Sequence, residues 1–356
     1  MKICIPITSF GKAGGFKVLI NLANKWSELG HQVTIIVHAS TEQSYYSIHK
    51  KVNVIKLNNH GQTTNVSIPF SVLSSIKSLY WYLKNNSLKY DAVIANHYTT
   101  AYPIFLGSKT NNFFYIQAYE PEFFNERKGL LKKSIPKFIA WCSYYLPLIK
   151  IVNSNMYTRY KNITAKHISY PGIDLDIFFP KPNSLMQADH EIKIGCIGRN
   201  EKWKGSEDVA KAIEILHNKG YDNIKLYVAF NAVSYSRHVL VKPNTPKELS
   251  KFYRSVDIMV TPGHIQLDAI HYPVIESMAS GTSLITTGYY PASHTNSYIV
   301  PVADPLAIAY MIIHIINNPV EASKKRKNAL NDIKQFSWDV VAPSFINILS
   351  LYIDKK

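Results

Sequence analysis

Residues 257–287, DIMVTPGHIQLDAIHYPVIESMASGTSLITT, decide the fold that we expect of this chain. The stretch predicts a buried strand at Ile258–Val260, a polar loop, a short helix and a second strand at Leu284–Thr287. Pro273 and Gly281 bound the helix, because proline favours the first helical position and glycine favours the position just past the last one. Two parallel strands joined through a helix form a right-handed unit.

Ligands of such a unit bind beyond the carboxyl ends of the strands, where the helix N-terminus offers unpaired N–H groups. Glu276 lies one turn into the predicted helix, and its carboxylate can accept hydrogen bonds from two vicinal hydroxyls such as those of a ribose. Asp268, on the loop, adds a second carboxylate. The residues alone also fit an ordinary strand–helix–strand unit with a solvated aspartate and a glutamate that complements the helix dipole.

The stretch resembles the nucleotide-binding signature of the retaining glycosyltransferases of GT-B fold and GT4 (group 1) type. In that signature two glutamates, separated by seven residues, flank a Gly-aromatic-Gly-Leu-Pro segment. Glu276, Pro273 and the small residues at 277–281 match it, whereas Asp268 replaces the first glutamate and Ala269-Ile270-His271-Tyr272 replace the residues before the proline. The resemblance implies that Glu276 and Pro273 bind the donor nucleotide and that Asp268 acts at the sugar hydroxyls.

A second motif, IKIGCIGRNEKWKG at residues 192–205, ends a predicted strand in Gly-Arg and continues to Lys204-Gly205. Two cations at a strand-to-helix turn suit a diphosphate leaving group, because negative charge builds on it as the glycosidic bond breaks. The motif matches the family pattern Gly-Arg-x4-Lys-Gly, which implies that Arg199 and Lys204 bind the diphosphate. Because these cations replace the charge of a metal, we expect no metal and no cofactor besides a nucleoside diphosphate sugar as co-substrate. The alternative interpretation is that Arg199 and Lys204 are only surface charges.

The chain begins with a predicted strand at Lys2–Ile7, a glycine loop, a helix at Phe16–Leu29 and a strand at Val33–Val37. Gly14 and Gly15 let backbone N–H groups approach a phosphate or a sugar closely. The resemblance implies that this loop lies under the donor diphosphate and near the acceptor.

Two later predicted strands end in polar residues, His97 after the first and Gln117-Ala118-Tyr119-Glu120 after the second. The resemblance implies that His97 lies at the edge of the cleft and that Glu120 contacts the acceptor hydroxyl. A similar Gln-x-Tyr-Glu segment occurs in some bacterial rhamnosyltransferases of this superfamily. Considered alone, His97 is a structural hydrogen-bonding residue and Glu120 caps the following helix.

Strands alternate with helices in both halves, which is typical of two doubly wound domains. A polar, proline-containing connection at 181–190 predicts the boundary between them. We therefore expect an acceptor-side domain at 1–183 and a nucleotide-sugar-binding domain at 184–339, with a C-terminal helix at 340–356 that packs back on the first. The expected fold class is α/β, with the GT-B architecture of two Rossmann-like domains facing across a cleft.

The net charge of +16 lies mostly in the first half, where residues 1–183 hold 21 Lys+Arg and 8 Asp+Glu. Such a basic half suits an anionic partner: nucleic acid, an acidic acceptor or an anionic membrane surface. Basic and apolar residues interleave at 127–141, as in a helix that lies in a bilayer interface, or equally in a core-packed helix with a solvated basic face. No nucleic-acid motif accompanies them, so we expect no nucleic-acid partner.

No apolar run reaches the roughly 18 residues that span a bilayer. The N-terminus leads into the glycine loop without a cleavage site. These features predict a cytoplasmic protein, peripheral on the inner face of the cell membrane if the basic region binds there. Cys4, Cys142 and Cys196 are widely spaced, which favours reduced thiols over disulfides or a zinc site.

The resemblance spans nearly the whole chain and implies a hexosyltransferase-type glycosyltransferase (EC 2.4). It would move a sugar, with retention of configuration, from a nucleoside diphosphate sugar to a glycan or lipid-linked glycan acceptor. A composition rich in Asn, Lys, Ile and Tyr adds the expectation of a bacterial surface polysaccharide, lipopolysaccharide or capsule. Two alternatives stay open: another GT-B sugar-nucleotide enzyme such as an epimerase, and a non-catalytic protein that binds through its basic half and has a degenerate cleft.

Overall fold

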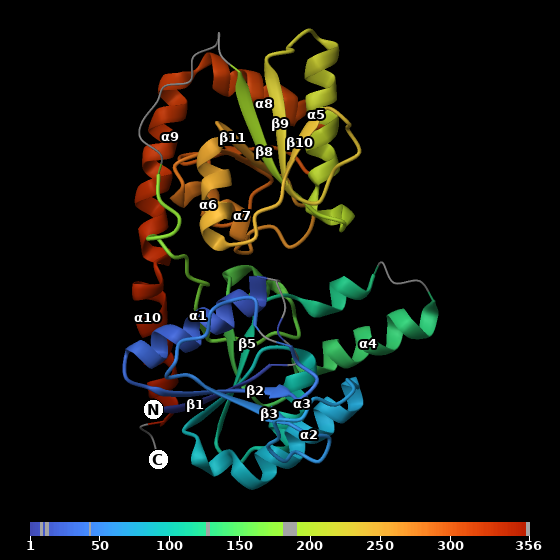
Figure 1. The fold of residues 1–356 in the computed structure, drawn as a ribbon, viewed down its shortest axis with the longest axis vertical. Helices are drawn as coiled ribbons and strands as arrows, with labels where there is room; N and C mark the ends of the chain where they lie inside the picture. The colour runs from blue at the N-terminus through green and yellow to red at the C-terminus, as the bar shows by residue number, and fades with distance from the viewer. Residues whose placement is uncertain (8–9, 11–13, 43, 126–128, 181–190, 354–356) are drawn as a thin grey trace. The chain divides into compact units, whose positions relative to one another are not determined.

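The protein divides into two compact units, one made of Met1–Gly172 with Trp338–Lys356 and the other of Ile173–Ser337 (Figure 1). The computed structural model describes residues 1–7, 10, 14–42, 44–125, 129–180 and 191–353. Each unit is built on one parallel sheet, whose central strands are buried on both faces because helices cover both faces.

The first unit holds a seven-stranded sheet in the order β3-β2-β1-β4-β5-β6-β7. Its strands are β1 (Lys2–Pro6), β2 (Gln32–His38), β3 (Asn53–Leu57), β4 (Ala92–Ala95), β5 (Asn111–Ile116), β6 (Ile149–Val152) and β7 (His167–Ile168). Its helices are α1 (Gly14–Glu28), α2 (Val72–Asn86), α3 (Tyr98–Gly107), α4 (Leu130–Ser143) and α10 (Trp338–Ile353), with short 3-10 turns η1 (Ser87–Lys89), η2 (Glu120–Phe124) and η3 (Asn155–Arg159).

The second unit holds a six-stranded sheet in the order β10-β9-β8-β11-β12-β13. Its strands are β8 (Ile192–Gly198), β9 (Ile224–Phe230), β10 (His238–Val241), β11 (Ile258–Thr261), β12 (Ser283–Thr286) and β13 (Tyr298–Ile299). Its helices are α5 (Ser206–Asn218), α6 (Pro246–Ser255), α7 (Tyr272–Ala279), α8 (Pro305–Asn317) and α9 (Pro319–Asp332), with 3-10 turns η4 (Lys202–Lys204) and η5 (Ile333–Phe336). Helices α5 and α8 pack together over a core of buried aliphatic side chains from the sheet.

The strand–loop–helix–strand unit predicted at 257–287 is present as β11, α7 and β12. Strand β11 pairs with β12 in parallel, with Ile258 opposite Ser283. Gly281 has a φ of +66°, the left-handed conformation that ends a helix without a Cβ penalty. The sequence signals therefore gave the correct element types and order at this place.

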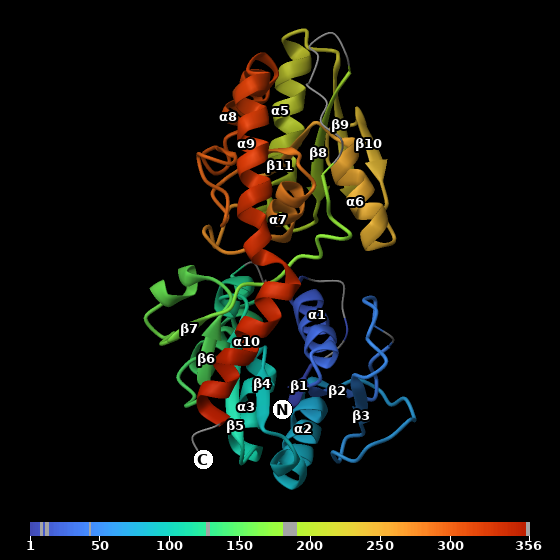
Figure 2. The same cartoon turned by 90° about the vertical axis from the view of Figure 1, so that its left-hand side faces the viewer.

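The C-terminal helix α10 is part of the first unit. The indole Nε1 of Trp26 on α1 donates a hydrogen bond to Ala342 O at 3.0 Å. Further along α10, the ring of Phe345 meets Tyr115 of β5 at 5.0 Å between centroids, and the ring of Tyr352 meets Phe113 at 5.9 Å. Figure 2 shows the ribbon of α10 within the first unit. Packing of aromatic side chains holds α10 against the sheet.

The division between the units falls after Gly172, so residues 173–180, assigned from the sequence to the first domain, belong to the second unit. The reason is packing: Ile173 N donates to Phe336 O at 2.7 Å, and the ring of Phe178 lies edge-on to that of Tyr253 at 6.0 Å. The connection expected at 181–190 lies outside the described residues.

Candidate functional site

Two cations of the second unit follow β8 at the carboxyl edge of the sheet. Arg199 comes directly after Gly198, is exposed, and carries its guanidinium carbon 5.8 Å from the ring centroid of Phe230. Gly198 is required there, since an added Cβ would lie 1.7 Å from Asn231 O. The strand end thus brings the Arg199 backbone close to the β9 loop and leaves the guanidinium facing solvent.

Lys204 ends the 3-10 turn η4 and is only partly exposed. Gly205, with φ +71°, turns the chain so tightly that an added Cβ would meet Pro262 O at 1.9 Å. Lys204 Nζ lies 3.4 Å from His271 Nε2. Burial, with a further contribution from Arg199, lowers the pKa of Lys204 below its ordinary value. A lysine at such a place gains by pairing with an anion.

Glu276 lies on α7 and is 3% exposed. Its Oε2 accepts a hydrogen bond from the hydroxyl of Tyr253 on α6 at 2.8 Å. Burial, together with the neighbouring carboxylate, holds the pKa of Tyr253 far above its ordinary value, so the phenol stays a donor. Pro273, in the first turn of α7, is buried. The helix therefore fixes Glu276 deep beside Tyr253, not on an open surface.

Asp268 lies on the loop between β11 and α7 and is exposed. Its φ of +66° is in the left-handed region, which aspartate tolerates better than most residues, and its backbone N donates to Gly288 O at 2.9 Å. The sequence therefore supplies an aspartate that suits this turn as well as the predicted contact with sugar hydroxyls. Its action at the donor sugar stays a prediction.

Arg199, Lys204, His271 and the Tyr253–Glu276 pair form one electrostatic cluster. Arg199 and Lys204 both lower the pKa of His271, with burial the larger cause, and Arg199 also acts on Tyr253. The structure thus brings together three of the predicted donor-binding residues. Their roles stay predictions, as do those of the residues named next.

In the first unit, Glu120 begins η2 and is buried. Its Oε2 accepts a hydrogen bond from Tyr98 N at 3.0 Å. Glu120 therefore caps α3, which precedes it in the chain. The alternative interpretation of the sequence was that Glu120 caps the helix that follows it. The Glu120 backbone N donates a hydrogen bond to the Tyr144 hydroxyl oxygen at 3.1 Å. Burial raises the pKa of Glu120 to about 8.

His97 is the N-cap residue of α3. Its Nδ1 accepts from Thr99 N at 3.4 Å and lies 2.7 Å from Thr99 Oγ1, which assigns the ring proton to Nε2. That Nε2 lies 4.0 Å from Glu120 Oε2, too far for a direct hydrogen bond. Burial lowers the pKa of His97, so the imidazole is neutral near pH 7. His97 therefore has a structural role and also faces Glu120.

Gly14 and Gly15, expected on the loop before the first helix, are instead the first two residues of α1. A polar contact links Gly15 to Gln117. Gln117 Nε2 donates to Gly15 O at 3.4 Å, and a Cβ on Gly15 would lie 3.6 Å from the Gln117 amide. The Gln117 backbone O accepts from both Asn153 and Tyr157. Gln117, quoted in the sequence motif but given no role, thus contacts the first turn of α1.

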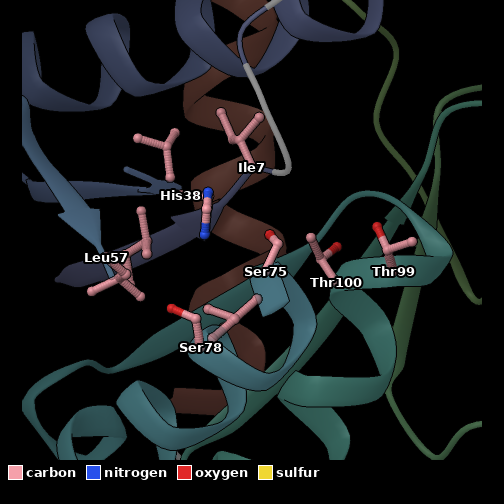
Figure 3. Close-up of a pocket in the computed structure, with 10 residues that line it drawn as sticks. Ile7, His38, Leu57, Ser75, Ser78, Thr99 and Thr100 are labelled. Carbon is pink, nitrogen blue, oxygen red and sulfur yellow. The ribbon is translucent and has the colours of Figure 1, made fainter. Parts of the chain in front are cut away.

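A pocket of the first unit lies among β1, β2, β3, α2 and α3 (Figure 3). Its walls include Ile7, His38, Leu57, Ser75 and Thr100. The space open to the centre of a water molecule is about 10 Å³, which is room for one water. This pocket is too small for a sugar nucleotide, and its lining includes none of the predicted site residues.

The raised pKa of Glu120 can be tested through the pH dependence of thermal stability. Because burial raises the pKa of Glu120 to about 8 from an ordinary 4.5, the folded state holds a proton that the unfolded state releases. This contribution to stability is complete below pH 4.5 and is lost as the pH rises through about 8. Glu120→Gln keeps an acceptor for Tyr98 N and removes the titration. We expect its melting temperature, relative to the parent, to be higher at pH 9 than at pH 4; an equal difference at both would contradict the assignment.

Several absences hold for the part of the chain that the structure describes. There, no group of three or more His, Cys, Asp or Glu side chains is arranged to hold a metal ion. Within the same residues, no helix is both long and apolar enough to cross a membrane. Cys4, Cys142 and Cys196 are free thiols, and the first and last of them are buried.

Comparison with known proteins agrees with this architecture. Residues 191–318 match the model of the family Glycosyl transferases group 1. Over 195 residues the chain is 27% identical to the capsular polysaccharide biosynthesis glycosyltransferase CapM of Staphylococcus aureus, and the alignment covers 48% of this chain. The chain spans 50% of that curated relative.

Solved structures with the same fold cover nearly the whole chain. Sucrose-phosphate synthase from Thermosynechococcus elongatus matches with a TM-score of 0.81 at 14% identity, covering 100% of both chains. Anabaena Alr3699/HepE in complex with UDP and glucose matches at 0.73 and 14% identity, covering 98% of this chain and 99% of the other. WaaG, a glycosyltransferase involved in lipopolysaccharide biosynthesis, matches at 0.72 and 11% identity, with the same coverage of both chains.

The fold is therefore that of the GT-B glycosyltransferases, and the fold class predicted from the sequence is confirmed. The match of residues 191–318 to the Glycosyl transferases group 1 model confirms the resemblance stated above. The expected enzyme class, glycosyltransferase (EC 2.4), agrees with this match.

Proposed function

We propose that this chain transfers a sugar from a nucleoside diphosphate sugar to a glycan or lipid-linked glycan acceptor, with retention of configuration, in bacterial surface polysaccharide synthesis. One observation carries the proposal: Arg199, Lys204 and the buried Glu276 lie in one electrostatic cluster at the carboxyl edge of the second sheet. This is where open α/β sheets bind their ligands. The group 1 domain and the capsular polysaccharide relative support the reaction class.

In the proposed reaction the second unit binds the donor. Glu276 accepts hydrogen bonds from the ribose hydroxyls while Tyr253 orients its carboxylate. Arg199 and Lys204 stabilise the diphosphate as it leaves, when its negative charge grows. Asp268 contacts the sugar, and Gly14 and Gly15 contact the diphosphate. Two fixed cations supply the positive charge, so we expect turnover to persist in the presence of EDTA.

The first unit is proposed to bind the acceptor through Glu120 and His97. A carboxyl group whose pKa is raised to about 8 holds its proton near pH 7 and releases it just above that range. Such a group can donate a hydrogen bond to the acceptor or take a proton from its hydroxyl. His97 Nε2–H, which faces the same carboxyl, can donate to an acceptor oxygen. Both contacts await a bound acceptor.

A donor assay tests the reaction class. Purified protein is incubated with UDP-glucose and other labelled nucleotide sugars, with and without membrane lipids or glycan fragments, and the products are separated. Acceptor-dependent release of nucleoside diphosphate with label on the acceptor supports transfer. Acceptor-independent conversion of the sugar nucleotide would indicate an epimerase-like enzyme, and the absence of any conversion favours a non-catalytic protein.

We also propose that an exposed face of α4 binds an anionic membrane surface. Ile135, Phe138 and Trp141 follow one another at helical spacing and Tyr145 continues the line, with 53%, 64%, 38% and 58% of each residue exposed. The rings of Phe138 and Trp141 stack at 6.1 Å, and Trp141 meets Tyr145 at 4.8 Å. Lys133 and Lys137 lie on the same helix, within the half of the chain that carries the excess positive charge. Exposed aromatics beside lysines suit the interface of an anionic bilayer.

Vesicle sedimentation tests this face. Phe138→Ser with Trp141→Ser should weaken binding to phosphatidylglycerol vesicles by at least on the order of 10-fold, because two aromatic side chains lose their apolar contact. Leu306→Ser with Tyr310→Ser is the matched control, since those side chains are 63% and 71% exposed on α8 of the other unit. Equal losses in both double variants, or binding to phosphatidylcholine vesicles as tight as to anionic ones, would contradict the proposal.

A further inference from the structure

His271 lies between β11 and α7, at the position where the glycosyltransferase signature has its second glycine. His271 is the N-cap residue of α7, yet its side chain makes no capping hydrogen bond to the helix. The ring instead packs against Tyr289, with centroids 4.6 Å apart and planes tilted by 33°. The Tyr289 hydroxyl donates to Ile265 O at 2.8 Å, which fixes the phenol ring in turn. The imidazole is thus held by a packed, hydrogen-bonded neighbour.

The contact with Lys204 determines which nitrogen of the His271 ring carries the proton. Lys204 Nζ, 3.4 Å from His271 Nε2, is an ammonium that only donates, so Nε2 accepts and the ring proton lies on Nδ1. Burial and the two nearby cations hold the pKa of His271 far below its ordinary value, which keeps the ring neutral. Nδ1 is buried and has no hydrogen-bond partner among the described residues. A buried donor without an acceptor costs roughly 1–3 kcal/mol, so this arrangement does not serve stability alone.

Because the acceptor, His271 Nε2, is neutral, it does not cancel the positive charge of Lys204. A carboxylate at position 271 would also hold the ammonium, but it would cancel the positive charge that a diphosphate needs. Within the described part of the chain, Lys204 forms no direct ion pair, and the carboxylate of Glu201 acts on its pKa less than burial and Arg199 do. An imidazole therefore orients the lysine and leaves its full charge for a ligand.

We propose that His271 is a positioning residue for Lys204: its Nε2 holds the lysine ammonium, still cationic, toward the diphosphate of the donor. The inference rests on the proposed function, because it assigns to this pair the phosphate groups of the same donor. It predicts that His271 acts only through Lys204 and only on ligands that carry the diphosphate.

Calorimetric titration of single and double variants tests this coupling. The probes are UDP and uridine or, where GDP, dTDP, CDP or ADP binds the parent protein instead, that nucleotide and its nucleoside. His271→Leu removes the acceptor, and His271→Gln keeps one at a similar reach. We expect His271→Leu to weaken diphosphate binding by about 10-fold, since one hydrogen bond to a charged group is lost. His271→Gln should stay within about 3-fold of the parent, and neither change should alter binding of the nucleoside.

The background variant Lys204→Ala separates positioning from direct contact. In that background His271→Leu should have no further effect on diphosphate binding, because the residue through which it acts is gone. A full additional loss there would overturn the proposal, and so would parent-like affinity of His271→Leu with Lys204 intact. If His271→Leu does not fold, His271→Gly with added imidazole replaces it, and restoration of affinity by imidazole supports the proposal. Failure of the parent itself to bind any nucleoside diphosphate would instead contradict the proposed function.

Discussion

Arg199→Ala is expected to slow sugar transfer by on the order of 100-fold, because one of two cations that stabilise the leaving diphosphate is removed. The structure supports a functional effect without a folding defect: the guanidinium lies at the exposed end of β8, over the Phe230 ring, and its loss leaves the strand intact. Initial rates at saturating acceptor measure the loss of turnover, and the melting temperature of each variant shows whether it folds like the parent.

Arg237→Ala is the matched control. Arg237 is an exposed arginine of the same unit, paired with Asp222 at 3.2 Å, and its removal should leave turnover unchanged because exposed pairs contribute little. If Arg199→Ala turned over sugar as fast as the parent, the assignment of the diphosphate site would be wrong. A similar loss in Arg237→Ala would point to a general effect of net charge.

Glu276→Ala is expected to weaken binding of the nucleoside diphosphate by roughly 10- to 100-fold, because hydrogen bonds from ribose hydroxyls to a charged acceptor are lost. The same loss should follow when the parent protein is given a 2′,3′-dideoxynucleoside diphosphate, which lacks both hydroxyls. The two changes should not add: once Glu276 is gone, the hydroxyls contribute little. Titration calorimetry with both nucleotides and both proteins gives the four affinities.

Tyr253→Phe controls for the buried hydrogen bond. It removes the 2.8 Å contact to Glu276 Oε2 but keeps the carboxylate, so nucleotide affinity should fall less than in Glu276→Ala. Equal losses in the two variants would mean that the pair supports the fold of α6 and α7, and that Glu276 does not bind ribose. Additive losses from Glu276→Ala and the dideoxynucleotide would lead to the same conclusion.

The sequence predicted the fold wherever strong local signals coincide. The unit of β11, α7 and β12 follows from an apolar run, a helix-starting proline and a helix-ending glycine, and these signals depend only on neighbouring residues. Strands β3 and β10 were not predicted. Both are edge strands. Lys56 interrupts the apolar residues of β3, and the apolar run of β10 is only three residues long, Val239–Val241, and lies half-buried or exposed.

The sequence predicted which residues form the candidate site, but not which residues they contact. Motif spacing selected Arg199, Lys204 and Glu276, because chemistry fixes which side chains a diphosphate and a ribose require. The partners Tyr253 and His271 were not assigned, since each lies on a different element from the residue it contacts. Tyr253 on α6 bonds Glu276 on α7, and His271 at the start of α7 contacts Lys204 on η4. Glu120 shows the same limit: its bond to Tyr98 N joins residues 22 positions apart.

Thermal unfolding of the parent protein with millimolar UDP, GDP, dTDP, CDP and ADP, repeated on Glu276→Ala, tests the donor site most directly. A nucleotide present at about 100 times its dissociation constant stabilises the folded state by roughly 2.7 kcal/mol. The account predicts a higher melting temperature with at least one of these nucleotides and the loss of that increase in Glu276→Ala. Unchanged melting with all five would contradict a nucleotide site at the carboxyl edge of the second sheet.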